Sequence, residues 1–414
     1  MPRLFRNIGW LLGSRGVNAL FSLVYLALAT RTLGLDDFGR FSLIVVLAQA
    51  VTGFATFQTW QAVVRWGTAE REVDDALGFA LALDALSVVC GTVIAALVCW
   101  SAPLWLPLPP DLRLPAFALC LAALLAIRST PTGLLRLHDR YGKAALAETA
   151  LPATRAAGAG IAALFAPGIA GFVAVWALAE IACAAAFWII ALRVHGKRVP
   201  LPSLTRLPAR HADAWRFVWA TNLSRSLAVT AKQVLLLLVG ALGGAALAGG
   251  YRVASQLGQA LVQLAEAVGR ALYPELVRAG GEAAAITARM ARLSLLTGAL
   301  AVGFAWLLGG VALVWLAGPG FGFAHGAMVI LALAGAAELF AANWDALLVS
   351  QARAGLAFAI RAVPLGLALA AMPGAMAAWG LEGVALCVLA ASALTAAGFA
   401  YVVGARPGMR GAMR

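Results

Sequence analysis

The sequence predicts an all-α membrane protein of about twelve transmembrane helices, and three observations support that prediction. Of the 414 residues, 63% are hydrophobic and 12% are charged, whereas a soluble domain is about 45–50% apolar and about 25% charged. The mean hydropathy is +0.89. Apolar stretches recur that are long enough to cross a bilayer, which takes about 20 residues of helix. A soluble enzyme is therefore excluded as a class.

Long apolar stretches separated by short polar or Gly-Pro connections define the expected spans. The first is expected to be an uncleaved span, because no small-residue cleavage site follows it. All five cysteines fall inside apolar runs and are expected to pack as small apolar side chains. The spans are predicted at residues 8–30, 41–64, 76–100, 112–135, 143–165, 168–192, 215–239, 247–270, 293–317, 323–349, 354–378 and 382–404.

The distribution of basic residues predicts the orientation of the chain. With the N-terminus in the cytoplasm, 21 of the 31 lysines and arginines lie on the cytoplasmic side, and seven lie within spans. Only Arg31, Arg40 and Arg113 fall in outer loops. Because lysine and arginine concentrate in cytoplasmic loops, both termini are expected there, with an even number of spans. The same rule accounts for the net charge of +13, so no nucleic-acid partner is expected.

Two halves of similar sequence flank a basic linker. Residues 1–193 are predicted as one six-helix bundle and residues 215–414 as a second, with 194–214 as a cytoplasmic tether near anionic lipid head groups. Similar segments recur 209 to 213 residues apart, such as Ser14-Arg15 with Ser224-Arg225. Six spans per half make parallel repeats, which in transporters surround a central substrate cavity that opens alternately to each side. The repeat therefore predicts a transporter.

Thirteen charged residues lie within the predicted spans. Each would cost about 2.5–3.5 kcal/mol at a lipid-facing helix centre, so they are expected to face a cavity, pair with one another or lie near an interface. In spans 1, 2, 7 and 8, polar residues recur at helical spacing, which places them on one inward face. The predicted substrate-binding residues are Arg15, Asn18, Arg225, Lys232, Arg252, Gln256 and Gln259.

The sign of the charge in this predicted cavity indicates the sign of the charge on its ligand. Arginines and a lysine at its centre favour a phosphate or diphosphate, because guanidinium groups match those oxygens. The alternative for the same residues is a set of structural ion pairs between helices. Ion pairing or proton coupling is expected for a second group, in which Glu338 and Asp345 would neutralise Arg361 and Glu148 would pair with Arg155: Asp84, Glu148, Arg155, Glu338, Asp345 and Arg361. No spacing indicates a metal, a cofactor or a catalytic residue.

Two parts of the sequence resemble a known family. The first runs from Asn7-Ile8-Gly9-Trp10 through Ser14-Arg15-Gly16 to Arg31-Thr32-Leu33-Gly34-Leu35-Asp36-Asp37-Phe38-Gly39-Arg40-Phe41-Ser42. The second runs from Tyr251-Arg252 to Leu272-Tyr273-Pro274-Glu275-Leu276. Both resemble the Wzx-type O-antigen and polysaccharide flippases of the multidrug/oligosaccharidyl-lipid/polysaccharide exporter superfamily. The number of spans and the short outer ends argue against the fourteen-span peptidoglycan-precursor branch.

The resemblance implies a V-shaped pair of six-helix bundles in the bacterial inner membrane, with a cationic lumen to which Arg15, Arg225 and Arg252 contribute. It implies outward flipping of an undecaprenyl-diphosphate-linked oligosaccharide, with membrane lipid and polysaccharide-assembly proteins as further partners. Three other functions stay open. A multidrug exporter of organic cations needs lumen acids, a polysaccharide polymerase or ligase needs a large outer loop, and a scaffold makes the cavity charges dispensable.

Overall fold

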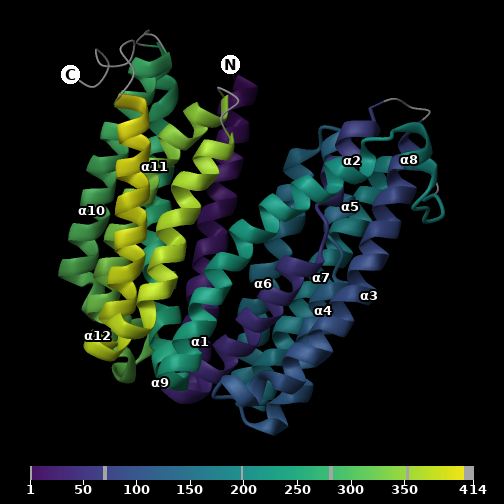
Figure 1. Cartoon of the computed structure of the whole chain (residues 1–414). Helices are drawn as coiled ribbons and strands as arrows, with labels where there is room; N and C mark the ends of the chain where they lie inside the picture. Colours follow the sequence, from purple (N-terminus) through teal and green to yellow (C-terminus); the bar gives the residue numbers. More distant parts are fainter. Residues whose placement is uncertain (1, 69–71, 197–198, 279–282, 351–353, 405–414) are drawn as a thin grey trace. The chain divides into compact units, whose positions relative to one another are not determined.

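The computed structural model describes residues 2–68, 72–196, 199–278, 283–350 and 354–404, and all that follows concerns these ranges. They contain helices and no β-strand, which confirms the predicted all-α fold. The chain forms two compact units, Met1–Ala245 and Ala246–Arg414 (Figure 1).

The N-terminal unit is a helix bundle in which two of the membrane-spanning segments are interrupted by short non-helical stretches. Residues 56–58 separate α1 from α2, and residues 126–128 separate α4 from α5. The unit also contains the first part of α9. Its elements in chain order are α1 (Pro2–Ala55), α2 (Thr59–Trp66), α3 (Val73–Trp105), the 3₁₀ helix η1 (Pro110–Leu112), α4 (Arg113–Leu125), α5 (Ser129–Leu137), α6 (Tyr141–Phe165), α7 (Ile169–His195), α8 (Arg206–Arg210) and α9 (Ala214–Arg278).

The C-terminal unit consists of the remainder of α9 and three long helices. α11 packs against both α10 and α12 (Figure 1). The interior of this unit is apolar, with Trp344, Ala357 and Phe399 in one buried cluster. Its further elements are α10 (Ala283–Ala317), the 3₁₀ helix η2 (Pro319–Ala324), α11 (His325–Ser350) and α12 (Ala354–Gly404).

Three helices continue through a sharp bend where the sequence predicted a loop between two spans. The bends lie at Gly34 in α1, Gly244 in α9 and Gly380 in α12, where φ is 73°, 84° and 55°. Glycine adopts these positive φ angles readily because it has no Cβ. A single glycine therefore replaces the loop expected between spans 1 and 2, 7 and 8, and 11 and 12.

Eight described stretches are long and apolar enough to cross a membrane. The longest two, Asn18–Trp66 and Gly355–Val402, have 49 and 48 residues, about twice what one crossing takes, and each includes a glycine bend. Gln233–Ala260 also spans a bend. With α1, α9 and α12 each crossing twice, α4 and α5 forming one crossing, and α3, α6, α7, α10 and α11 one each, the chain has the twelve predicted spans.

The predicted internal repeat recurs in the backbone. Gly34 and Gly244 share ψ angles of −174° and −179° as well as positive φ. A 3₁₀ helix precedes α11 as it does α4, and the bend at Gly380 matches the junction before α7. The two copies differ at the interruptions. In the second copy, α9 and α11 run unbroken through residues 266–268 and 338–340, which correspond to the breaks at 56–58 and 126–128.

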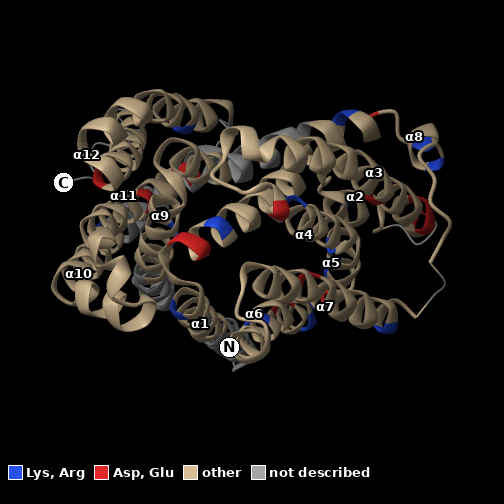
Figure 2. Cartoon of the chain, turned by 90° about the horizontal axis from the view of Figure 1, so that it is seen from below, with Lys and Arg blue, Asp and Glu red and all other residues tan. Residues whose placement is uncertain are grey.

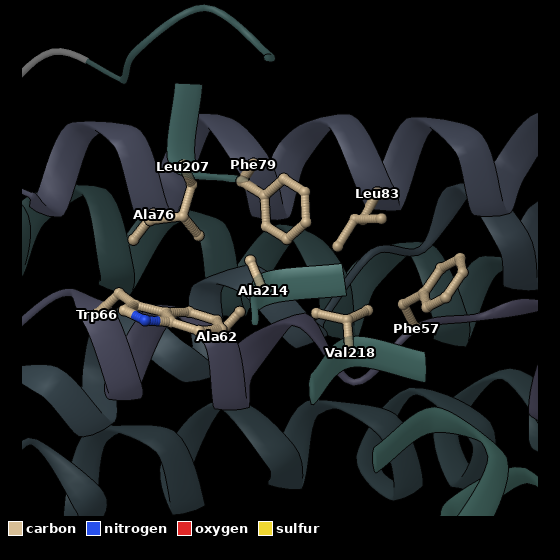
Figure 3. Packing of buried hydrophobic residues seen from close by; sticks show 9 residues of the cluster. All are labelled: Phe57, Ala62, Trp66, Ala76, Phe79, Leu83, Leu207, Ala214 and Val218. Carbon is tan, nitrogen blue, oxygen red and sulfur yellow. The ribbon is translucent and has the colours of Figure 1, made fainter. Parts of the chain in front are cut away.

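The linker packs closely on the N-terminal unit. Leu207 of α8 and Ala214 and Val218 of α9 are buried against Phe79 of α3 and Trp66 of α2 (Figure 3). This cluster explains why the boundary between the compact units lies after Ala245 and not in the linker. The basic helix α8 is one of the blue segments of Figure 2.

Ion pairs fix the linker at the same place. Arg210 lies 2.6 Å from Asp75, Asp213 lies 2.8 Å from Arg65, and the imidazole of His211 lies 3.1 Å from Glu72. The backbone N–H of Ser203 also donates to the carbonyl of Gly78. Residues 199–214 are thus an ordered part of the N-terminal unit, where the sequence predicted a tether.

We expect Gly34→Ala to destabilise the protein by about 1–3 kcal/mol, because that φ and ψ combination is strained for every residue with a Cβ. No atom lies within 4 Å of an added Cβ, so the cost comes from the backbone alone. The matched control is Gly160→Ala inside α6, where space is equally open and alanine is the better helix former by about 1 kcal/mol. Denaturation midpoints of the purified proteins in detergent measure both changes. Equal midpoints for the two variants would contradict the strain at Gly34.

Candidate functional site

A polar cavity of about 490 Å³ lies inside the N-terminal unit, beside the two helix interruptions. Residues of both breaks line it, together with side chains from α1, α3, α6, α7 and α9. Sites at interrupted helices are common in membrane transporters, because broken backbone is tolerated where it faces a polar cavity. The polar and aromatic lining residues are Gln49, Thr52, Thr56, Phe57, Gln58, Trp60, Asp84, Ser87, Arg128, Ser129, Thr132, Arg155, Trp176, Glu180 and Gln233.

Side chains of neighbouring helices satisfy the backbone at the breaks. The N–H of Phe57 donates to Ser87 Oγ of α3 at 3.3 Å, and the N–H of Trp60 donates to Ser129 Oγ of α5 at 3.1 Å. At the second break, the indole N–H of Trp188 donates to the carbonyl of Ile127 at 2.9 Å. These bonds replace part of the intrahelical ladder, since the first N–H groups of a helix lack partners within it.

Asp84 joins the two interrupted helices. Its carboxylate accepts one hydrogen bond from Thr59 Oγ1 at 3.0 Å and a short one from Thr130 Oγ1, and the residue is 5% exposed. Thr59 begins α2 and Thr130 is the second residue of α5. A negative charge at two helix N-termini is favourable because the helix dipole is positive there. Asp84 therefore fixes α2 and α5 to α3.

One carboxylate pairs with two arginines of the cavity lining. Glu180 of α7 accepts from Arg128 through Oε2 and from Arg155 through Oε1, both at 2.8 Å. The guanidinium of Arg155 also lies 4.8 Å from the ring centroid of Trp176. The predicted pair of Arg155 with Glu148 is not what the structure contains, because Glu148 lies on the exposed side of α6 while Arg155 turns toward α7.

The cavity lining contains two arginines, Arg128 and Arg155, and two acidic residues, Asp84 and Glu180. Glu180 pairs with both arginines, whereas Asp84 is buried and accepts from threonine hydroxyls. The cavity in the N-terminal unit thus contains residues of both signs, unlike the cationic cavity that the sequence predicts from other residues. The side chains of Arg15, Arg225 and Lys232, on which that prediction depends, lie outside the described residues.

The remaining predicted binding residues lie elsewhere on α1 and α9. Oδ1 of Asn18 is buried and has no hydrogen-bond partner among the described residues. In the C-terminal unit, Arg252 and Gln256 are partly buried, one turn apart on α9. Gln259 is exposed and its amide donates to Ser255 Oγ at 3.3 Å. Their role in binding substrate stays a prediction.

The predicted ion-pairing residues of the C-terminal unit separate into two contacts. Arg361 of α12 lies 2.8 Å from Asp345 of α11. Glu338 does not join them and accepts a hydrogen bond from Ser392 at 3.2 Å. Within the described residues no group of three or more His, Cys, Asp or Glu side chains is placed to hold a metal ion.

Sequence reasoning missed several residues of the cavity. Thr130 and Trp176 were not singled out, and Glu180 was only counted among the charges within spans. Thr59 was placed on the inward polar face of span 2, together with Gln49, Thr52 and Thr56, without a partner being assigned to it. The run Ser129-Thr130-Pro131 carries a usable signal, because small polar residues followed by proline are typical of a helix start. No glycine or proline marks residues 56–58, so that break has no comparable signal in the sequence.

Twelve spans, an internal repeat and interrupted helices beside a cavity define a polytopic membrane protein with an architecture that is common among transporters. The sequence comparison places it in a family. The family model described as "Polysaccharide biosynthesis protein" matches residues 4–279, more than half of the sequence, so the chain belongs to the polysaccharide biosynthesis protein family. It is also 30% identical over 295 residues to the inner membrane protein YghQ of Escherichia coli (strain K12), covering 66% of this chain and 80% of that protein.

Solved structures of MATE transporters share the fold. The multidrug transporter DinF-BH matches with a TM-score of 0.64 at 13% identity, over 100% of this chain and 97% of that chain. The transporter VcmN of Vibrio cholerae matches with a TM-score of 0.56 at 14% identity, over 97% of this chain and 94% of that chain. At such low identity these matches establish the fold and leave the substrate open.

We expect Glu180→Gln to destabilise the protein by about 3 kcal/mol, because it leaves the guanidinium of Arg155 buried without its carboxylate. The side chains of Arg155 and Glu180 are each 11% exposed. Glu148→Gln is the matched control, and its effect should stay within about 0.5 kcal/mol since Glu148 is exposed. Unfolding by denaturant in detergent gives both free energies. A larger loss for Glu148→Gln would mean that the ion-pair assignment is wrong.

Proposed function

We propose that this protein is a flippase. It moves an anionic polyprenyl-diphosphate-linked oligosaccharide from the cytoplasmic to the outer leaflet, for surface polysaccharide synthesis, by alternating access. One observation carries the proposal: a chain of the polysaccharide biosynthesis protein family has the twelve-span fold of a transporter. Polysaccharide precursors assembled on a lipid in the cytoplasm need a membrane protein to bring their polar head group across, because the bilayer core excludes it.

The basic residues predicted for the lumen support an anionic substrate. Arg15 and Arg225 occupy matching positions in the two sequence repeats and would bind the diphosphate through charge-assisted hydrogen bonds. An exporter of organic cations would require acids at these positions. The positive-inside pattern supports an orientation with both termini in the cytoplasm, in an inner membrane.

We expect Arg15→Ala and Arg225→Ala each to lower the rate of flipping at least tenfold, because each would remove a charged partner of the diphosphate. The assay is transfer of a polyprenyl-diphosphate oligosaccharide across proteoliposome membranes. Arg40→Ala is the matched control, since Arg40 forms a half-exposed pair with Asp37 at 2.8 Å and contributes little. If both variants flip the lipid at the wild-type rate, the two arginines have a structural role and do not bind the diphosphate. A wild-type protein that exports an organic cation and not the lipid would refute the flippase.

We also expect an inside-negative membrane potential to accelerate flipping. An anion that moves outward gains about 2.3 kcal/mol per charge per 100 mV. Potassium gradients with valinomycin set the potential across the proteoliposome membrane, and the reversed gradient is the control. The expected order of rates is inside-negative, then zero, then inside-positive. Equal rates at all three potentials would exclude electrical assistance.

A further inference from the structure

We propose that the cavity of the N-terminal unit binds sugar residues of the transported glycan, as a subsite for a neutral polyhydroxylated ligand of about disaccharide size. That the sugar is part of a lipid-linked substrate rests on the proposed function. The binding chemistry of the cavity rests on its own lining, described next.

The charged groups of the cavity are already engaged within its lining. Glu180 accepts from the guanidinium groups of both Arg128 and Arg155 at 2.8 Å. The oxygens of Asp84 accept from two threonine hydroxyls. The hydroxyl and amide groups of the lining are then the groups that a ligand would meet.

The hydroxyl groups of the lining present acceptors to the cavity. Thr52 Oγ1 donates its proton to the carbonyl of Ala48 at 2.8 Å, and Thr56 Oγ1 donates to the carbonyl of Thr52 at 2.7 Å. Ser87 Oγ donates to the carbonyl of Leu83 at 2.9 Å in the same way. A hydroxyl has one proton, so the oxygens of Thr52 and Thr56 offer their lone pairs to a ligand. Ser87 Oγ already accepts from the N–H of Phe57 and keeps one lone pair. Lone pairs repel phosphate oxygens and accept O–H groups, which sugars carry in number.

Amide and aromatic side chains of the lining supply the further hydrogen bonds and the apolar contact that a sugar ring can make. Gln49 and Gln233 line the cavity, and each side-chain amide can both donate and accept, as a sugar hydroxyl does. Trp60 adds indole surface against which the apolar C–H face of a sugar ring can pack. The guanidinium of Arg136 lies 3.9 Å from the centroid of this indole.

Size and repeat structure agree with a ligand site. A volume of about 490 Å³ falls in the range of about 300–1,000 Å³ typical of small-molecule pockets. The helix breaks that form the cavity occur in the first repeat, whereas the corresponding parts of α9 and α11 are unbroken. The second repeat folds without these helix breaks, so the fold does not require them. Binding a ligand is the use that remains for the breaks in the first repeat.

The test is direct binding of soluble sugars to the full protein in lipid nanodiscs. Lactose, maltose and diacetylchitobiose are the neutral probes, and inorganic diphosphate and tetraethylammonium are the charged ones, each titrated by calorimetry. We expect millimolar or tighter binding of at least one disaccharide. We expect at least fivefold weaker binding in Gln49→Leu and Gln233→Leu, because each variant leaves ligand hydroxyls unpaired. Thr52→Val, which removes one acceptor at nearly constant volume, should also weaken binding.

Gln61→Leu is the matched control and should bind as the wild type does, because Gln61 lies on α2 outside the cavity lining. The proposal is overturned if no disaccharide binds, if only a charged probe binds, or if all variants bind equally. Flipping measured in parallel separates the two proposals. A protein that flips the lipid but binds no disaccharide keeps the flippase and loses the sugar subsite, and the reverse result keeps the subsite alone.

Discussion

A membrane-spanning helix can be interrupted only where other groups take over its backbone hydrogen bonds, and this constraint shapes the N-terminal unit. The two interruptions lie beside each other and are satisfied from neighbouring helices: Ser87 serves Phe57, Ser129 serves Trp60, and Asp84 holds the hydroxyls at the starts of α2 and α5. The polar groups that stabilise the breaks are the same groups that make the cavity polar. The residues that stabilise the helix breaks therefore also form the cavity.

The second determinant is the sharing of Glu180 between two arginines. A buried ion pair needs good geometry to offset desolvation, and Glu180 uses one oxygen for each guanidinium at 2.8 Å. Both guanidinium groups are thereby engaged within the lining. The residues predicted to bind a diphosphate are others, namely the basic residues of spans 1, 7 and 8.

The sequence predicted the fold class, the spans and the repeat, because apolar length and the charge of the loops depend on the bilayer and little on tertiary packing. It predicted loops at the bends, since a helix that turns at one glycine looks the same in sequence as two helices with a short connection. It paired Arg155 with Glu148 because both lie on one helix, whereas the partner, Glu180, lies on the next helix and 25 residues away. Side-chain pairing between helices depends on their rotation, which hydrophobic periodicity leaves undefined.

The two repeats differ at the helix breaks, and this difference bears on how function is distributed between the two halves of the chain. Both copies keep the glycine bend and the 3₁₀ entry to the fourth span, so these features belong to the shared fold. The first copy adds two helix breaks, and with them Asp84, Thr59 and Thr130 as a buried polar cluster. Buried polar groups are stabilising only when they are satisfied, and the hydrogen bonds among these three residues satisfy them. A lipid-linked sugar has two unlike ends, a charged diphosphate and a neutral glycan. A chain with a cavity lined by hydroxyl and amide groups, and with the basic residues predicted on spans 1, 7 and 8, has chemistry for both.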